Sequence, residues 1–415
     1  MLNKVSVGVR NLQKYRMILG NELIDELEKL AGELRDVRIC HVNSTQYGGG
    51  VAELLSSYIP LVRSLGITID WQVIHGDRPF FTVTKSLHNA LQGSDSALVR
   101  GQDALEIYET QSKANALEMD YNYDVFIIND PQPAAIRYFR DDTHAKWIWR
   151  CHIDTSEPDE EAWNFLHTYL KRYDAAIFTM ADFVPRNLKV PIIETMAPAI
   201  DALSAKNMAL PRGLCREMTD NLGIDRGRPL ILQVSRFDPW KDPFGVMEIY
   251  RLAKEKVPGL QLALVGSLAA DDPEGSEMYA AIHTEADKDD DIYVFTNLTG
   301  VGSMQVNAFQ TACDVVIQKS IREGFGLVVS EALWKARPVV AGNAGGIPMQ
   351  MTGNLSQYLV QSIEECAEKV VYLLRNQKVS AKLGREGKEN VKRNFLIPRL
   401  MRDELSLVKR VLEGR

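Results

Sequence analysis

The chain has 415 residues, of which 45% are hydrophobic and 25% are charged. These values are ordinary for globular proteins and exclude a fibrous, disordered or membrane-embedded chain. Because a domain usually spans about 100–200 residues, the length predicts two domains. The net charge of -7 and the lack of a basic cluster argue against nucleic-acid binding.

No stretch of uncharged apolar residues approaches the roughly 18 needed to cross a bilayer, and the first residues do not resemble a signal peptide. The cysteines are odd in number, scattered and free of any CxxC pair. This usage is typical of a reducing compartment, so we expect a cytoplasmic protein with buried, unpaired thiols. The cysteines are Cys40, Cys151, Cys215, Cys313 and Cys366.

In chain order, short β-branched runs alternate with amphipathic segments of helical spacing. This pattern predicts buried parallel strands in βαβ units, arranged as doubly wound α/β domains. The first set of runs covers residues 37–42, 67–74, 124–129, 146–151, 175–179 and 191–195. The second set covers residues 230–235, 261–266, 291–296, 314–318, 338–341 and 357–360.

Glycine and proline punctuate residues 198–229, which separate the two sets of strands. We therefore expect a Rossmann-like domain over residues 1–200, a linker with one short helix over 201–228, and a second Rossmann-like domain over 229–395. Residues 396–415 predict a final helix that crosses back to the N-terminal domain. Ligands of doubly wound folds bind beyond the carboxyl ends of the strands, so the expected site is a central cleft between two facing domains.

Three successive glycines, Gly48, Gly49 and Gly50, follow the first predicted strand and open the next helix. Glycine allows a ligand to approach the backbone closely, and the N–H groups at a helix N-terminus attract phosphate. A tight strand-to-helix turn is the alternative. The dinucleotide fingerprint G-x-G-x-x-G fails because Glu53 stands where the third glycine would be, and no P-loop motif occurs.

Two cations, Arg236 and Lys241, follow the predicted strand at 230–235. At the carboxyl end of a strand they could clamp a diphosphate, because charge-assisted hydrogen bonds are strong. The alternative is a solvated loop in which the arginine pairs with a neighbouring aspartate.

Glu323 and Glu331 flank a glycine-rich turn between the strand at 314–318 and a helix that begins near Leu327. The glycines at 324 and 326 would present backbone N–H groups to a phosphate. The carboxylates accept hydrogen bonds only and would suit sugar and ribose hydroxyls. Glutamates are common in a helix-rich chain, which is the alternative, but the surrounding glycines favour a site.

Asp130 and His152 directly follow the strands at 124–129 and 146–151, on the same predicted edge as the glycine loop. Polar residues on one edge favour a site, although a lone histidine is more often structural. Acidic clusters at 271–272 and 289–291 could bind a hard cation, but their polar neighbours favour solvated loops.

The E-x7-E stretch from Glu323 to Glu331 is followed by Gly345-Gly346-Ile347-Pro348. Together with Arg236, Lys241 and the glycine loop, these motifs resemble the retaining nucleotide-sugar glycosyltransferases of family 4. That family has the GT-B fold, in which two Rossmann-like domains face each other. The resemblance covers nearly the whole chain.

Segments 43–53, 129–133, 149–154 and 319–327 resemble more closely the trehalose glycosyltransferring synthases, and the retaining trehalose phosphorylases share much of this pattern. Many members of the broad family have Pro-Ser where this chain has Lys319-Ser320, a departure that fits the trehalose branch. They also have a glycine where this chain has Ala336-Arg337, a change at a helix end that we do not expect to touch the chemistry.

The resemblance implies a retaining, reversible glucosyltransferase that forms trehalose from a nucleoside diphosphate glucose (UDP-glucose or ADP-glucose) and free glucose. It implies no prosthetic group, no metal, and no nucleic-acid or membrane partner; it leaves a homodimer open. The alternatives are a trehalose phosphorylase that uses inorganic phosphate, a GT-B transferase with another sugar acceptor, a binding protein without catalysis, and a glycoside hydrolase that uses the two glutamates.

The resemblance also assigns roles to individual residues. The cations would stabilise the leaving diphosphate, and Glu323 and His152 would contact the donor sugar. The implied catalytic residues are Arg236, Lys241, Glu323 and His152. The implied donor- and nucleotide-binding residues are Gly49, Gly50, Gly324, Phe325, Gly326, Leu327, Glu331, Asn297 and Leu298. The implied acceptor-binding residues are Asp130, Gln132, Arg150, Asp154 and Gln46.

Overall fold

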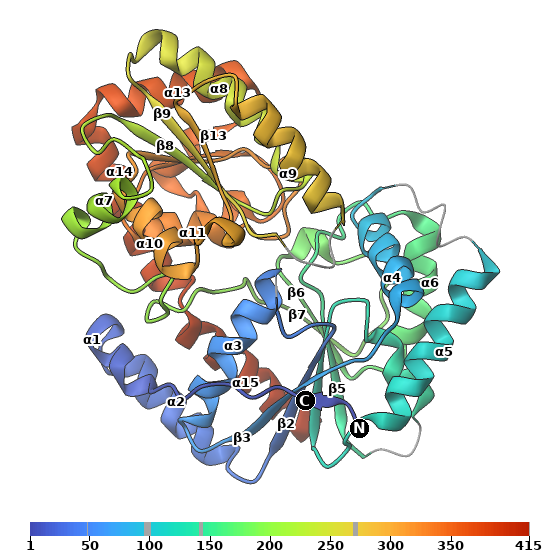
Figure 1. The fold of residues 1–415 in the computed structure, drawn as a ribbon. Helices are drawn as coiled ribbons and strands as arrows, with labels where there is room; N and C mark the ends of the chain where they lie inside the picture. The colour runs from blue at the N-terminus through green and yellow to red at the C-terminus, as the bar shows by residue number, and fades with distance from the viewer. Residues whose placement is uncertain (48, 95–100, 141–143, 269–272, 415) are drawn as a thin grey trace. The chain divides into compact units, whose positions relative to one another are not determined.

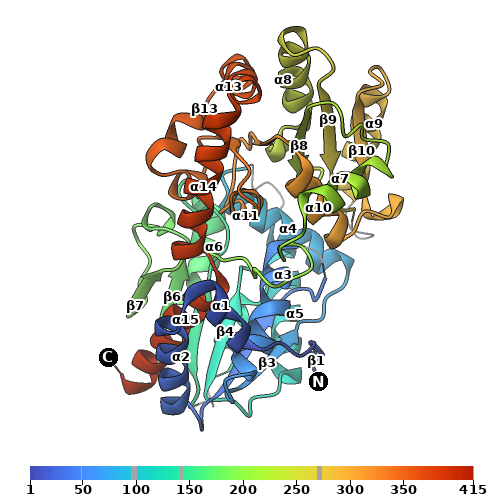
Figure 2. The same cartoon turned by 90° about the vertical axis from the view of Figure 1, so that its left-hand side faces the viewer.

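The computed structural model describes residues 1–47, 49–94, 101–140, 144–268 and 273–414. The chain divides into two compact units, Met1–Pro198 together with Ile397–Arg415, and Ala199–Leu396. Each unit is built on one sheet with helices on both faces (Figures 1 and 2). The final helix, α15 (Ile397–Glu413), belongs to the N-terminal unit although the chain reaches it last.

The first unit carries a seven-stranded sheet in the order β1-β3-β2-β4-β5-β6-β7. Neighbouring strands are parallel except at the edge, where β1 pairs antiparallel with β3. Strands β4 and β6 are buried along their whole length, as expected of parallel strands covered on both faces. The strands are β1 (Asn3–Lys4), β2 (Arg38–Asn43), β3 (Thr68–Val73), β4 (Val125–Asn129), β5 (Lys146–Arg150), β6 (Ala175–Phe178) and β7 (Ile192–Thr195).

Helices α2, α3 and α15 lie on one face of this sheet, and α4, α5 and α6 lie on the other (Figure 1). The short 3-10 segment η2 follows β4 and packs against α5 and α6. The helical elements are η1 (Leu12–Tyr15), α1 (Arg16–Leu19), α2 (Glu22–Glu33), α3 (Gly49–Arg63), α4 (Arg78–Leu91), α5 (Gln102–Glu118), η2 (Ala134–Phe139), α6 (Glu160–Leu170) and η3 (Ala181–Phe183).

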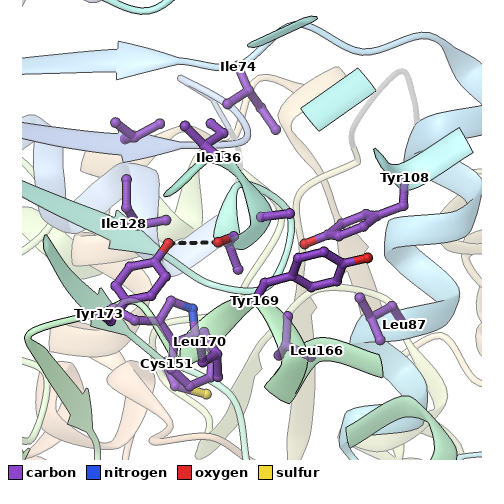
Figure 3. Packing of buried hydrophobic residues seen from close by; sticks show 14 of the residues in the cluster. Ile74, Leu87, Tyr108, Ile128, Ile136, Cys151, Leu166, Tyr169, Leu170 and Tyr173 are labelled. Carbon is purple, nitrogen blue, oxygen red and sulfur yellow. Dashed lines mark hydrogen bonds between the residues drawn. The ribbon is translucent and has the colours of Figure 1, made fainter. Parts of the chain in front are cut away.

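Buried tyrosines in the core of the first unit hold the loop that follows β4 (Figure 3). The hydroxyl of Tyr108 donates to the carbonyl oxygen of Pro131 at 2.7 Å, and that of Tyr173 donates to Ala134 at 2.8 Å. A buried hydroxyl without a partner is costly, so these bonds tie the packing of the core to the position of the loop. The loop carries Asp130, one of the predicted site residues.

The second unit carries a six-stranded, fully parallel sheet in the order β10-β9-β8-β11-β12-β13. This is the Rossmann order, in which the first strand lies at the centre and the chain winds outward in both directions. The strands are β8 (Leu230–Val234), β9 (Gln261–Val265), β10 (Ile292–Phe295), β11 (Val315–Gln318), β12 (Val339–Gly342) and β13 (Leu359–Val360).

Helices α8 and α13 pack together on one face of the second sheet, and α10 and α11 lie on the other (Figure 1). The helical elements are α7 (Arg212–Asp220), η4 (Pro239–Lys241), α8 (Pro243–Lys256), α9 (Pro273–Ala286), η5 (Asn297–Thr299), α10 (Ser303–Ala312), α11 (Leu327–Trp334), α12 (Ile347–Gln350), η6 (Gly353–Tyr358), α13 (Ile363–Arg375) and α14 (Gln377–Asn394).

Each of the twelve predicted strands is present, within a few residues of the predicted bounds. The last one, β13, has only two residues because residues 353–358 form η6 instead. The edge strand β1 was not predicted, since two residues carry no alternating pattern. The segment 201–228 contains α7, which packs against α10 through Cys215, Ala308 and Ala312. The prediction of buried, free cysteines is confirmed for all five.

Candidate active site

The order of the strands reverses between β8 and β11 in the second unit, and ligands of open α/β sheets bind at such a point. The loops that leave these two strands are joined by an ion pair. Lys241 Nζ lies 2.8 Å from Glu323 Oε2, and Ser320 Oγ donates to the same oxygen at 3.1 Å. The structure therefore brings together Lys241 and Glu323, which lie 82 positions apart in the chain.

A second ion pair runs beside the first with its charges reversed. Lys319 Nζ lies 2.6 Å from Asp242 Oδ2, so each loop contributes one cation and one carboxylate. Asp242 has a left-handed φ of 50°, which aspartate tolerates better than most residues, and its Oδ1 accepts from the N–H of Gly245 to cap α8. Gln233 Nε2 donates to the carbonyl oxygen of Lys241 at 2.7 Å and fixes the same turn. Neither Gln233 nor Asp242 was predicted as a site residue.

Arg236 lies in the same segment after β8 as Lys241, but it does not contact Glu323 in the structure. Its side chain is 61% exposed and pairs with Asp238 at 3.4 Å, which is the local pairing considered as the alternative. Burial raises the pKa of Asp238, although Lys241 and Arg236 counteract it. The diphosphate role of Arg236 stays a prediction.

The glycine-rich turn at residues 324–327 is tightly packed against residues 345–350. Gly326 has a φ of 82° and precedes α11, whose first residue is Leu327. A Cβ on Gly345 would lie 1.5 Å from the carbonyl oxygen of Glu323, so only glycine fits there. Gln350 Nε2 donates to the carbonyl oxygen of Phe325 at 2.5 Å. No motif pointed to Gln350, which fixes this turn.

Glu331 is 1% exposed, and both of its oxygens are engaged. Lys206 Nζ lies 2.9 Å from Oε1, and Gln310 Nε2 donates to Oε2 at 3.0 Å. Burial would raise the pKa of Glu331, but the charges of Lys206 and Lys335 outweigh it and lower the pKa. The structure thus holds this carboxylate ionised inside the unit, and its ribose role stays a prediction.

Asn297 and Leu298 lie in η5, just beyond the carboxyl end of the edge strand β10. The Asn297 amide bonds to both backbone groups of Leu268, at 2.8 and 3.1 Å, while Leu298 is 76% exposed. Nothing in the structure brings them to Lys241 within the described residues, so their role in nucleotide binding stays a prediction.

In the first unit, the order of the strands reverses between β2 and β4. Beyond β2, the Asn43 side chain donates to the carbonyl oxygen of Thr45, and Gln46 is exposed. Gly49 has a φ of 79° and opens α3 together with Gly50, both exposed; Gly48 lies outside the described residues. The loop therefore leads into a helix N-terminus, as predicted, and its phosphate role stays untested.

Asp130 and His152, from neighbouring strand ends, are in direct contact. Asp130 Oδ1 accepts from the backbone N–H of His152 at 2.8 Å, and the N–H of Asp130 donates to the carbonyl oxygen of Arg150 at 2.8 Å. Asp130 has a left-handed φ of 65° and is 7% exposed. Burial raises its pKa to about 7, despite the N–H of His152 and the charge of Arg150. Burial also lowers the pKa of His152 well below its ordinary value.

The Arg150 side chain belongs to a buried charge cluster with His41 and with Glu404 of α15. Its Nη1 donates to Glu404 Oε2, and His41 Nε2 lies 3.2 Å from Glu404 Oε1. Burial would raise the pKa of Glu404, but His41 and Arg150 outweigh it and lower the pKa to about 2. Both Arg150 and Glu404 are nearly inaccessible, at 2% and 1% exposed, so an acceptor contact by Arg150 stays a prediction. Neither Glu404 nor His41 was predicted from the sequence.

The remaining predicted acceptor residues lie nearby in the chain. Gln132 follows Pro131 and is half-buried, whereas Asp154 is 7% exposed and accepts from the N–H and hydroxyl of Ser156. Both stay predictions as acceptor contacts.

The acidic run at 289–291 lies in a partly exposed turn, as predicted, and its two outer carboxylates pair with basic side chains. Lys254 Nζ contacts Asp289 at 2.8 Å and Asp291 at 3.0 Å, and Arg228 contacts Asp291 at 2.6 Å. The run at 271–272 lies outside the described residues. Across the described ranges, no three His, Cys, Asp or Glu side chains gather as metal ligands. In the same part of the chain, no helix is long and apolar enough to cross a membrane.

Comparisons with known proteins agree with this architecture. A family model described as the N-terminal domain of trehalose synthase matches residues 41–185, and one described as glycosyl transferases group 1 matches residues 216–390. A trehalose synthase from Rubrobacter xylanophilus is 48% identical over 99% of this chain and 100% of its own length. A trehalose phosphorylase from Grifola frondosa is 29% identical over 86% of this chain and 55% of its own length.

Solved structures show the same fold at low identity. A sucrose-phosphate synthase from Thermosynechococcus elongatus has a TM-score of 0.66 at 16% identity and covers 91% of this chain and 99% of its own. A protein from Anabaena, solved with UDP and glucose, has a TM-score of 0.64 at 13% identity over 90% and 99%. The near full-length identity, the two matched domains and the two Rossmann-like sheets agree: the chain belongs to the trehalose synthase family of GT-B glycosyltransferases.

Proposed function

We propose that this protein is a glycosyltransferase that forms trehalose from a nucleoside diphosphate glucose and free glucose. The observation that carries the proposal is the Lys241–Glu323 pair at the reversal point of the second sheet. It places a cation and a carboxylate side by side, and a nucleotide sugar offers a diphosphate next to sugar hydroxyls. The full-length similarity to a trehalose synthase supports the choice of sugars.

The proposed reaction moves one glucosyl group. The bond between the anomeric carbon and the diphosphate breaks, and a bond to the 1-hydroxyl oxygen of the acceptor glucose forms. The hydroxyl proton leaves with the nucleoside diphosphate, so the charges balance. Attack on the face that the diphosphate leaves gives retention, and the reaction is proposed to be reversible.

The proposal gives a role to side chains in each unit. In the second unit, Lys241 and Arg236 stabilise the charge that develops on the departing diphosphate, and Glu323 accepts from donor-glucose hydroxyls. The backbone N–H groups of the turn at 324–327 face the phosphates. In the first unit, Asp130 accepts from hydroxyls of the acceptor glucose and His152 contacts the donor sugar. The two cations make a metal unnecessary in this proposal.

A trehalose phosphorylase is the second candidate, since relatives with that name match at 29% identity. Those relatives are longer, because this chain spans only 55% of the Grifola frondosa protein. A phosphorylase would use inorganic phosphate in place of the nucleoside diphosphate and would need no nucleotide at all. A GT-B transferase with another sugar acceptor is the third outcome of the test.

A product assay separates these candidates. The protein is incubated with UDP-glucose or ADP-glucose and free glucose in the presence of a metal chelator, and in parallel with trehalose and inorganic phosphate. Trehalose with free nucleoside diphosphate in the first arm is the expected result. Glucose 1-phosphate in the second arm, with no product in the first, would move the assignment to a phosphorylase. Nucleotide-sugar consumption only with another acceptor would overturn the assignment of glucose.

A further inference from the structure

The last residue of β4, Asn129, is a buried amide between two histidines. It is 1% exposed, and its Nδ2 lies 3.1 Å from the carbonyl oxygen of Val42 and 3.3 Å from that of Ile127. Both carbonyl oxygens can only accept, so the NH₂ group of the amide must face them. The orientation of the amide is thereby fixed by its neighbours, and its oxygen points the other way.

The amide oxygen of Asn129 lies 2.9 Å from Nε2 of His152. An oxygen that can only accept requires a donor, so Nε2 must carry a proton. Burial, assisted by the charge of Arg150, lowers the pKa of His152 well below its ordinary value, which keeps the ring neutral at neutral pH. A neutral imidazole with its proton on Nε2 has a bare Nδ1. Among the described residues, no hydrogen bond reaches that nitrogen.

His41 also lies close to Asn129. Its Nδ1 is 3.5 Å from Nδ2 of Asn129, at the outer limit of a hydrogen bond, and its Nε2 is 3.2 Å from Oε1 of Glu404. The orientation of the Asn129 amide therefore rests on the carbonyl oxygens of Val42 and Ile127.

We propose that Asn129 is a positioning residue that holds His152 as the Nε2–H tautomer, so that Nδ1 accepts a hydrogen bond from a sugar hydroxyl. A bare Nδ1 accepts from a hydroxyl but offers no proton to a phosphate oxygen. His152 therefore selects a hydroxyl-bearing, uncharged portion of the substrate. The tautomer stands on the structure alone, whereas the contact with sugar rests on the proposed function.

The first test needs no variant. The full chain is labelled with ¹⁵N-histidine, and two-bond ¹H–¹⁵N correlation spectra are recorded at neutral pH without substrate. The signal of His152 is assigned by its disappearance in His152→Asn. A protonated Nε2 and a bare Nδ1 are expected. A proton on Nδ1, or a doubly protonated ring, would overturn the proposal.

The second test uses Asn129→Leu, with Asn115→Leu as the matched control. Asn115 is also 1% exposed and bonds to both backbone groups of His75, at 2.8 and 2.9 Å, away from His152. In Asn129→Leu, His152 is expected to populate both tautomers, and kcat/KM for glucosyl transfer is expected to fall roughly tenfold, the equivalent of one hydrogen bond. Asn115→Leu is expected to leave the tautomer unchanged. An unchanged tautomer in Asn129→Leu would overturn the proposal.

A third variant covers a failure of Asn129→Leu to fold. Asn129→Asp keeps an oxygen facing Nε2, so a proton on Nε2 is expected to persist there, and its loss would contradict the positioning role. The tautomer is read without turnover, so the two proposals fail separately. A protein that makes no trehalose but shows the expected tautomers would overturn the proposed function and support the role of Asn129.

Discussion

Lys241 and Glu323 lie 2.8 Å apart and join the two loops at the reversal point of the second sheet. Their side chains are only 15% and 12% exposed, so solvent screens the pair less than a surface pair. An incoming diphosphate would take the place of the carboxylate as a partner of Lys241. That exchange would leave Glu323 able to accept from sugar hydroxyls.

Replacing Lys241 tests this exchange. Lys241→Ala should lower kcat/KM for the nucleotide sugar roughly 30- to 1000-fold, because one electrostatic group is lost from the transition state. This fall corresponds to about 2–4 kcal/mol of transition-state stabilisation. Arg236→Ala should lower kcat/KM by an amount in the same range. Lys254→Ala is the control, because this lysine pairs with Asp289 and Asp291 elsewhere in the unit. Near-normal kcat/KM in Lys241→Ala and Arg236→Ala would exclude the diphosphate role.

The KM for the acceptor glucose should depend on pH through Asp130. Burial raises its pKa to about 7, so the carboxylate is protonated below that pH and accepts hydrogen bonds less well. The KM for glucose should therefore rise as the pH falls through 7, while in Asp130→Asn it should be high and insensitive to pH. Steady-state kinetics at saturating nucleotide sugar measure the KM for glucose in both proteins. The same pH response in Asp130→Asn would show that another group is responsible.

The raised pKa of Asp130 also has a consequence for stability. The folded unit binds this proton more tightly than the unfolded chain does, so the contribution is present at low pH and is lost as the pH rises from about 4 to 7. Asp130→Asn should remove that dependence. Urea denaturation of both proteins across this range measures it, and parallel curves would contradict the assignment.

Glu404 should be among the side chains of α15 that contribute most to the stability of the first unit. Removing one partner of a buried ion pair leaves the other charged and unpaired, so Glu404→Ala should cost about 3–5 kcal/mol of unfolding free energy. Asp403→Ala is the control, since its ion pairs with Arg399 and Arg402 are more exposed. Equal small losses in both variants would contradict the role of the cluster.

Acid should weaken the same cluster. The folded pKa of Glu404, about 2, lies below its ordinary value of 4.5. The ionised carboxylate therefore stabilises the unit above that ordinary value, and this stabilisation is lost as the pH falls towards 2.

Gly345 should not tolerate replacement, because the structure leaves no room for a Cβ at this position. A Cβ there would meet the carbonyl oxygen of Glu323, so Gly345→Ala must displace the loop that carries Glu323, and kcat/KM for the nucleotide sugar should collapse. Gly353→Ala is the control, because Gly353 has a similar φ, 60° against 50°, with no atom within 4 Å of the new Cβ. It should lose only about 1–2 kcal/mol of stability from backbone strain. Equal activity in the two variants would show that the loop tolerates displacement.

The strands were predictable because each is a short, continuous apolar run, which is what burial on both faces requires. The positions of the polar residues just beyond the strands were predictable for the same reason, because the ends of the apolar runs mark them. The partners of those residues were not predictable. Lys206 and Gln310 reach Glu331 from other elements, and no local pattern links such positions.

The buried position of Glu404 can be read from the residue pattern of α15. It lies four residues from both Leu400 and Val408, which are buried, so it falls on the apolar face of α15. A carboxylate on an apolar helix face requires a buried partner, and that requirement predicts a charge cluster. The identity of the partners, Arg150 and His41, came only with the fold.

The central claim is tested most directly with uniformly ¹³C-labelled free glucose and unlabelled nucleoside diphosphate glucose, followed by NMR as the reaction proceeds. The expected product is trehalose with one labelled and one unlabelled ring and both anomeric centres in the α configuration, with one nucleoside diphosphate released for each trehalose. Failure of the labelled glucose to enter any disaccharide, with both UDP-glucose and ADP-glucose, would contradict the account.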